Sequence, residues 1–174
     1  MGAARFPAMR EQPIRKVRRT PLYTAEQRQR RDASAWTLVQ AILAPVQFLV
    51  FAVSLVLILR YLATGEGLAV ATASIVLKTF TLYAIMITGA IWENEVFGQP
   101  LFAPAFFWED AVSMAVIALH TAYLVMILGS FGSPVLQLYV ALAAYAAYVV
   151  NAAQFVWKLR LARLDLSETG EAAA

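Results

Sequence analysis

The segment LFAPAFFWEDAVSMAVIALHTAYL, from Leu101 to Leu124, has the length and apolar content of a helix that spans a membrane. It also contains Glu109, Asp110 and His120, the single histidine of the chain. An ionisable side chain inside a bilayer costs several kcal/mol and usually marks a functional site. Glu109 and His120 share one face of the predicted helix, roughly 16 Å apart along its axis. The segment therefore predicts a membrane fold that encloses a polar site.

The composition of the whole chain is that of a polytopic membrane protein. Of its 174 residues, 61% are hydrophobic, and the mean hydropathy of +0.65 is too high for an ordinary soluble domain. The chain has no cysteine, which excludes disulfides, thiolate metal sites and cysteine nucleophiles. The sequence also contains no phosphate-binding loop and no zinc-binding spacing, so it indicates neither a nucleotide nor a zinc enzyme.

Four apolar segments predict an all-α fold, an antiparallel bundle of four transmembrane helices. Each is long enough to cross a hydrocarbon core of about 30 Å. The turns between them are short, and the one between the second and third segments is acidic, with no Lys or Arg. The segments cover about residues 36–61, 68–92, 101–129 and 135–157.

The segments that flank the bundle are polar. A capping box formed by Thr24 and Gln27 predicts a short amphipathic helix over about residues 25–33, lying on the membrane surface. The predicted organisation is a disordered basic tail (1–20), a four-helix membrane domain (21–164) and a disordered tail (165–174).

The basic residues are concentrated near the two ends of the chain. Nine of the fourteen Lys and Arg residues precede Trp36, and three more are Lys158, Arg160 and Arg163. Next to membrane segments such residues set the topology and contact anionic lipid, so we expect lipid contacts and no nucleic acid. The positive-inside rule predicts that both termini are cytoplasmic, which agrees with four spans.

Polar residues from all four predicted helices converge on the cytoplasmic half of the bundle. The amides Gln40 and Gln47 form a stripe on the first helix, and Lys78 lies deep in the second. Interhelical hydrogen bonds explain the amides better than ligand contact does, and for Lys78 snorkelling or pairing with a carboxylate is favoured over contact with an anionic ligand. The candidate site residues are Gln40, Gln47, Lys78, Glu93, Trp108, Glu109, Asp110, His120, Asn151 and Gln154.

Four runs of the sequence resemble a family of pigment-modifying enzymes. They are PLYTAEQRQRRDASAWTLVQAILAPVQFLVF, ATASIVLKTFTLYAIM, LFAPAFFWEDAVSMAVIALHTAYL and YVVNAAQFVWKLRLARL, and FAPAFFWED is the most specific part. Over about residues 21–164 the chain resembles the 3-vinyl bacteriochlorophyllide hydratases of bacteriochlorophyll biosynthesis. The resemblance implies a hydro-lyase of the bacterial inner membrane. This enzyme adds water to the C3 vinyl group of a magnesium chlorin such as chlorophyllide a and gives a 3-(1-hydroxyethyl) group.

The resemblance assigns no catalytic residues, so their roles follow from chemistry. Adding water to a vinyl group begins with protonation of its terminal carbon, and Glu109 is the predicted general acid. We expect Glu93 to lie close to Glu109, and Asp110 is a further candidate acid. His120 is the predicted axial ligand of the substrate magnesium. Lys78 is a candidate substrate-binding residue, and the anionic propionate of the pigment matches a cavity with a basic group nearby. No cofactor is expected, because the magnesium is part of the substrate.

The expected partners are the magnesium chlorin, membrane lipid and other enzymes of the bacteriochlorophyll pathway, while the oligomeric state is open. Two other functions remain compatible with the residues alone. A pigment carrier or assembly factor needs the histidine and the aromatic side chains but not the acids. A small transporter subunit would use Lys78 and the acids as an ion path.

Overall fold

The computed structural model describes residues 22–171, and the predicted tail of residues 1–20 lies outside this range. The described chain is entirely helical, which confirms the predicted fold class. Its four long helices are long and apolar enough to cross a membrane. The helices are α1 (Ala25–Ala33), α2 (Ala35–Thr64), α3 (Leu68–Phe97), α4 (Phe107–Leu128) and α5 (Pro134–Glu171).

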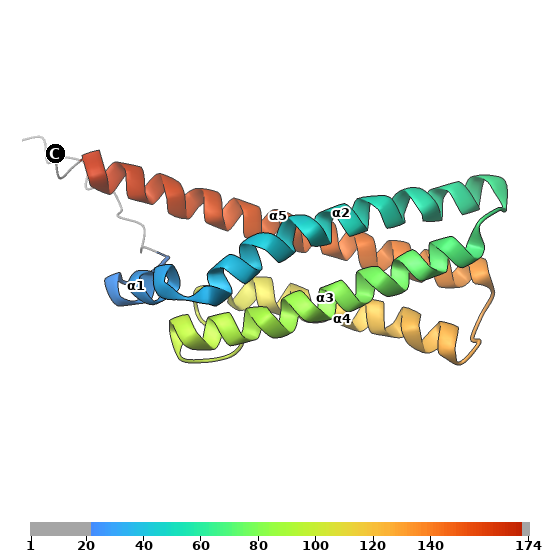
Figure 1. Cartoon of the computed structure of the whole chain (residues 1–174), viewed down its shortest axis with the longest axis horizontal. Coiled ribbons are helices and arrows are strands. Elements are labelled where there is room, and N and C mark those ends of the chain that lie inside the picture. Colours follow the sequence, from blue (N-terminus) through green and yellow to red (C-terminus); the bar gives the residue numbers. More distant parts are fainter. Residues whose placement is uncertain (1–21, 172–174) are drawn as a thin grey trace, which may run out of the picture.

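The four long helices form two antiparallel hairpins, α2–α3 and α4–α5, that pack against each other (Figure 1). Gly65 allows the sharp turn between α2 and α3, because its φ of +75° lies in the left-handed region that favours glycine. The short helix α1 lies at the end of the bundle where the α3–α4 connection and the end of α5 are found (Figure 1). This end therefore gathers both described ends of the chain.

The helix α1 is fixed at both of its ends. Thr24 accepts a hydrogen bond from the backbone N–H of Gln27, and the Gln27 side chain accepts one from the backbone N–H of Thr24. Next to this capping box, the buried ring of Tyr23 stacks on Phe97 at a centroid distance of 5.8 Å. The guanidinium of Arg31, in the last turn of α1, lies over the Tyr23 ring at 4.9 Å from its centroid. These contacts attach α1 to the end of α3.

The helix boundaries differ from the predicted ones at α4 and α5. We predict a helix from Leu101, but α4 begins at Phe107. Residues 101–106 form a connection in which Phe102 has a φ of +59°. Pro104 disfavours helical geometry at the preceding residue, and side-chain acceptors take over the backbone N–H groups there. At the other end of the chain α5 continues to Glu171, into the tail predicted to be disordered.

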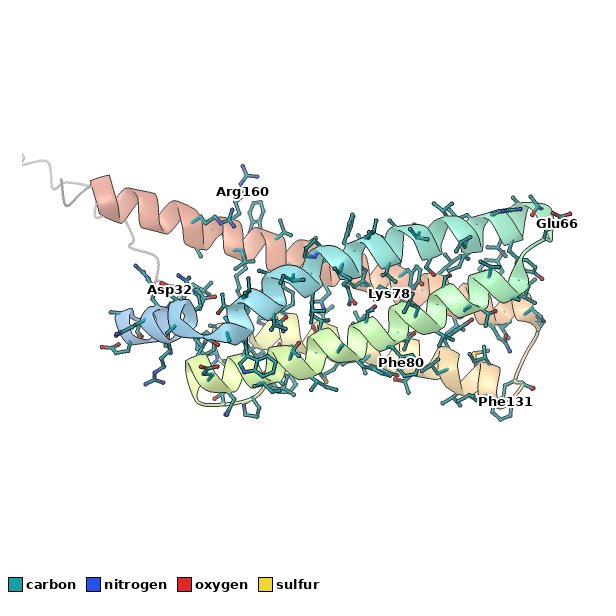
Figure 2. All side chains as sticks on the ribbon, viewed as in Figure 1. Asp32, Glu66, Lys78, Phe80, Phe131 and Arg160 are labelled. Atoms are coloured by element: carbon teal, nitrogen blue, oxygen red, sulfur yellow. The ribbon has the colours of Figure 1, made fainter. Side chains whose placement is uncertain are left out.

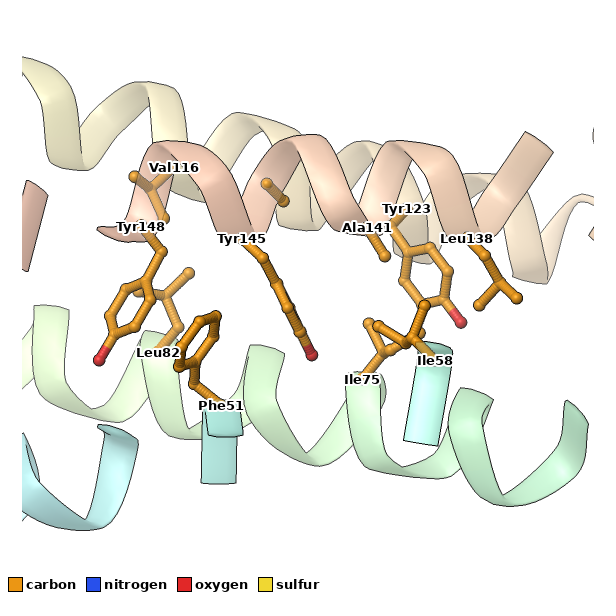
Figure 3. Close-up of a cluster of buried hydrophobic side chains, with 11 residues drawn as sticks. Phe51, Ile58, Ile75, Leu82, Val116, Tyr123, Leu138, Ala141, Tyr145 and Tyr148 are labelled. Carbon is orange, nitrogen blue, oxygen red and sulfur yellow. The ribbon is translucent and has the colours of Figure 1, made fainter. Parts of the chain in front are cut away.

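The space between the two hairpins is filled by large side chains. The ring of Phe51 in α2 lies 5.2 Å from that of Tyr145 and 5.1 Å from that of Tyr148, both in α5. Figure 3 shows these three rings close together, with Leu82 and Val116 beside them. Because protein interiors are close-packed, any ligand bound between the hairpins must displace some of these side chains.

Candidate functional site

The three candidate acids lie together where α3 meets α4. Glu93, Glu109 and Asp110 are exposed by 4%, 6% and 6%. Glu93 Oε1 accepts a hydrogen bond of 3.2 Å from the backbone N–H of Ala103, and Asp110 Oδ2 accepts one of 2.7 Å from that of Phe102. Both carboxyl groups thus hold the α3–α4 connection against the helices. Because they bind the N–H groups of neighbouring residues, the two carboxyl groups lie close together, and two close buried carboxyl groups do not readily ionise at the same time.

Glu109 has a different partner from the one that we predict. Its carboxylate forms an ion pair with Lys158 of α5, and the Lys158 ammonium also donates to the backbone carbonyl of Ala105. The structure therefore pairs Glu93 with Asp110 and Glu109 with Lys158, instead of Glu93 with Glu109. Lys158 is absent from the predicted site. Its position in the polar stripe of α5, four residues after Gln154, is the signal that points to it.

One level deeper in the bundle, a hydrogen bond joins α4 to α5. Asn151 Nδ2 donates to Ser113 Oγ at 2.7 Å, and both side chains are buried. Within the described residues, Asn151 Oδ1 is buried without a hydrogen-bond partner, and so is Oε1 of Gln154. Ser113 lies on the same face of α4 as Glu109 and His120. This pair therefore lies between the carboxyl groups and the histidine.

His120 presents a free nitrogen in the middle of the bundle. Its Nδ1 lies 2.8 Å from the backbone carbonyl oxygen of Val116, and its ring stacks on Tyr145 at 5.8 Å. Since a carbonyl oxygen only accepts, Nδ1 carries the proton and Nε2 presents a lone pair. In the described part of the chain this Nε2 has no hydrogen-bond partner, and the residue is 0% exposed. The imidazole is therefore oriented to act as a ligand through Nε2.

Lys78 lies about midway along the bundle, between the ends that carry Asp32 and Glu66 (Figure 2). It is 0% exposed, so it does not snorkel to either surface. Its Nζ lies 3.8 Å from the centroid of the Tyr148 ring and has no hydrogen-bond partner among the described residues. The ion pairs found in the described range join other residues, so Lys78 has no carboxylate counter-ion there.

Four buried polar atoms without partners come from four different helices. Gln47 and Lys78 belong to the first hairpin, and His120 and Asn151 belong to the second. A buried polar atom without a hydrogen bond costs about 1–3 kcal/mol, so such atoms are rare in a protein interior. Each of the four long helices carries at least one such atom. This distribution indicates a ligand that bonds to both hairpins.

Two predicted residues lie outside this group. Gln40 donates a hydrogen bond of 2.8 Å to Thr88 Oγ1, which joins α2 to α3 and leaves this amide a structural role. Trp108 is predicted to contact the substrate, but it is 71% exposed on the outer surface and packs against Phe107. Trp108 is therefore outside the buried polar group, and its contact with the substrate stays a prediction.

The described residues contain no group of three or more His, Asp or Glu side chains able to hold a metal ion. The bundle does offer a pair of neighbouring buried carboxyl groups, one imidazole lone pair and one buried cation. The remaining surfaces between the hairpins are aliphatic and aromatic. This set of groups suits a large apolar ligand that carries its own metal and one negative charge.

The chain is similar to proteins of one kind. A family model described as 2-vinyl bacteriochlorophyllide hydratase matches residues 23–161. A 2-vinyl bacteriochlorophyllide hydratase of Cereibacter sphaeroides is 70% identical over 146 residues, which are 83% of this chain and 90% of that protein. One of Rhodobacter capsulatus is 63% identical over 161 residues, or 92% of this chain and 91% of that protein. No solved structure matches.

Proposed function

We propose, on the premise that this chain belongs to the 2-vinyl bacteriochlorophyllide hydratase family, that its substrate binds between the two helical hairpins. The protein is a hydro-lyase that adds water to the vinyl group of a chlorophyllide-type pigment in bacteriochlorophyll synthesis. The position numbered 2 in these names is position 3 in the numbering used above. The predicted family is thus confirmed. The roles of individual residues in the reaction are proposed below from the geometry of the bundle.

The macrocycle takes the place of the rings that now fill the space between the hairpins, chiefly those of Phe51 and Tyr148. His120 Nε2 binds the substrate magnesium on its axial side, since it is an unpartnered lone pair on a neutral imidazole. The flat ring then lies against aromatic and aliphatic side chains of both hairpins. This placement rests on the buried polar atoms without partners, two from the first hairpin and three from the second.

The vinyl group points toward the end of the bundle that holds the acids. Asp110 and His120 are separated by about 15 Å along α4, at 1.5 Å per residue. Part of this distance is covered by the radius of the macrocycle, and the hydrogen-bonded pair of Ser113 and Asn151 lies in the remainder. We assign the attacking water to this pair, with Asn151 Oδ1 as its acceptor.

The proton comes from the pair of Glu93 and Asp110, because two neighbouring buried carboxyl groups do not both ionise and one of them keeps its proton. Glu109 is a less suitable source than the sequence predicts, since in its ion pair with Lys158 it is a carboxylate. Proton transfer to the terminal vinyl carbon leaves a cation at the inner carbon, conjugated with the macrocycle. Water adds there, and its extra proton returns to the carboxylate pair. The overall reaction consumes one water and regenerates the acid without any cofactor.

In this proposal the end of the bundle that holds Glu93 and Asp110 faces the cytoplasm. It carries α1 with its basic residues and the α5 segment that follows Trp157, whereas Glu66 lies in a turn at the opposite end (Figures 1 and 2). The positive-inside rule therefore orients both termini toward the cytoplasm of the bacterial inner membrane. Arg28 and Arg30 of α1 then meet anionic lipid headgroups. Enzymes that supply or consume the pigment are its further partners.

The test is hydration by the purified protein. Chlorophyllide a is incubated with the enzyme in detergent micelles, and the product is identified by the gain of one water in its mass and the loss of vinyl absorption. Variants that change His120, Lys78 or the carboxyl pair are compared under the same conditions. A protein that hydrates the pigment equally well with all of these residues changed would exclude the proposed site.

A further inference from the structure

Lys78 is a buried ammonium group for which the described residues provide no counter-ion. It is fully buried inside a membrane-spanning helix, where a lysine is unfavourable by several kcal/mol unless it is paired. Its described contact is with the face of the Tyr148 ring, at 3.8 Å. A cation–π contact compensates only in part for the loss of water around an ammonium group. The position therefore suggests an anion that is absent from the structure.

The surroundings of Lys78 limit the kind of anion. Ile75 and Leu82, one turn before and after it on α3, are buried and apolar. The nearby imidazole of His120 is a weak donor at most, since its proton is used on Val116. One ammonium with no second cation matches a single carboxylate on an otherwise apolar molecule, and not a phosphate.

The order of the groups along the bundle matches a chlorophyllide. Glu93 and Asp110 lie at similar depth, because they bind the N–H groups of the adjacent residues Ala103 and Phe102. At 1.5 Å per residue His120 lies about 15 Å from that level and Lys78 about 22 Å from it. Along the axis of the bundle, the carboxyl pair therefore comes first, then the metal ligand His120, and then the buried cation Lys78. In a chlorophyllide the vinyl group and the propionate likewise lie on opposite sides of the metal.

We propose that Lys78 binds the free propionate of the pigment and thereby selects the free acid over pigments whose propionate is esterified. This inference rests on the proposed function, since it uses the same site. On binding, the ammonium leaves the face of Tyr148 and pairs with the carboxylate. An ester has no charge to offer, so it leaves the buried ammonium unpaired, which disfavours its binding.

The experiment compares two pigments that differ in one group, chlorophyllide a and its propionate methyl ester. Their affinities for the purified protein are measured in the same detergent micelles by the change in pigment absorption. We expect the wild-type protein to bind the free acid at least about tenfold more tightly than the ester. Lys78→Met should bind both pigments with the affinity that the wild type has for the ester, and Lys78→Arg should retain part of the preference.

Leu77→Met is the matched control, because Leu77 is the neighbouring residue and is 56% exposed on the outer surface. It should keep the full preference for the free acid. Equal binding of acid and ester by the wild type would overturn the inference, and this comparison does not depend on the folding of any variant. Hydration of the ester as fast as the acid would also overturn it. A protein that prefers the acid but hydrates neither pigment would refute the proposed function and leave the selection by Lys78 standing.

Discussion

Asn151 Nδ2 donates a 2.7 Å hydrogen bond to Ser113 Oγ and so joins α5 to α4 between the carboxyl groups and His120. Its Oδ1 remains buried and unpartnered in the described part of the chain. This relationship fixes the amide plane, because Nδ2 is held by Ser113 and Oδ1 must then point away from it. The amide is thus prepared to accept a hydrogen bond from a water molecule.

We expect Asn151→Leu to bind the pigment but to hydrate it about ten- to a hundredfold more slowly, since the attacking water loses its acceptor. Ser113→Ala serves as the comparison. It removes the hydrogen bond but keeps Oδ1, so its rate should fall less, while its stability drops by about 1–3 kcal/mol because Nδ2 loses its partner. Single-turnover rates and thermal unfolding measure the two effects. Equal rates for Asn151→Leu and the wild type would contradict the role of Asn151.

The carboxyl pair should dominate the rate. Glu93→Gln and Asp110→Asn each keep an oxygen for the backbone N–H groups of the α3–α4 connection but remove a carboxyl group of the pair. We expect each to lower the hydration rate by about 10²- to 10⁴-fold, the usual cost of losing a general acid. The control is Glu95→Gln, which changes an exposed carboxylate at the same end of α3.

Glu109→Gln distinguishes the structure-based assignment from the sequence-based one. Its main effect should be on stability, because it leaves the Lys158 ammonium without its ion pair. If Glu109→Gln slows hydration a hundredfold in a folded protein while Glu93→Gln and Asp110→Asn remain active, the proton source is Glu109, as the sequence predicts.

The difference between these two assignments shows what a sequence can provide. Hydrophobic length and turn residues predict four spans, and periodicity correctly places Glu109, Ser113 and His120 on one face of α4. Periodicity places Lys158 on the polar stripe of α5, but it does not give the depth of one helix relative to another. It therefore does not predict that Glu109 pairs with Lys158 or that Glu93 lies beside Asp110. The late start of α4 depends on Glu93, a residue of another helix that binds the connection. Contacts of this kind arise only when the hairpins pack.

The role of His120 is testable with a metal-free pigment. His120→Ala should weaken the binding of chlorophyllide a and shift its absorption, because the magnesium loses its axial ligand. The magnesium-free form of the same pigment should bind to the wild type and the variant with equal affinity. A His120→Ala variant that binds chlorophyllide a with unchanged affinity and spectrum would show that this imidazole is not the ligand.

The topology is testable because the chain has no cysteine. Single cysteines at Glu66 and Ser133, which are exposed in the α2–α3 and α4–α5 turns, should react with an impermeant maleimide from the periplasm. A cysteine at Asn94, exposed near the end of α3, should react only after the membrane is opened. Labelling of Asn94→Cys in intact cells would place the carboxyl pair on the opposite side of the membrane.

We expect the α2–α3 and α4–α5 hairpins to move apart when the pigment binds. Tyr83 of α3 and Thr121 of α4 are joined by a hydrogen bond of 2.7 Å between their hydroxyl groups. Cysteines at these two positions are therefore close enough for a short bifunctional maleimide to hold α3 against α4. Since the rings of Phe51, Tyr145 and Tyr148 fill the space between the hairpins, a macrocycle enters only if the hairpins move apart.

We accordingly expect the short cross-link to lower pigment affinity at least about tenfold, while a long flexible cross-linker preserves binding. Each single-cysteine variant, treated with the same reagents, controls for the added groups. The amount of bound pigment is read from its absorption after removal of free pigment. If the protein joined by the short cross-link takes up chlorophyllide a as well as the untreated one, the pigment does not bind by separating α3 from α4. The pigment would then enter between α2 and α5, the other contact between the hairpins, or bind on the outer surface of the bundle.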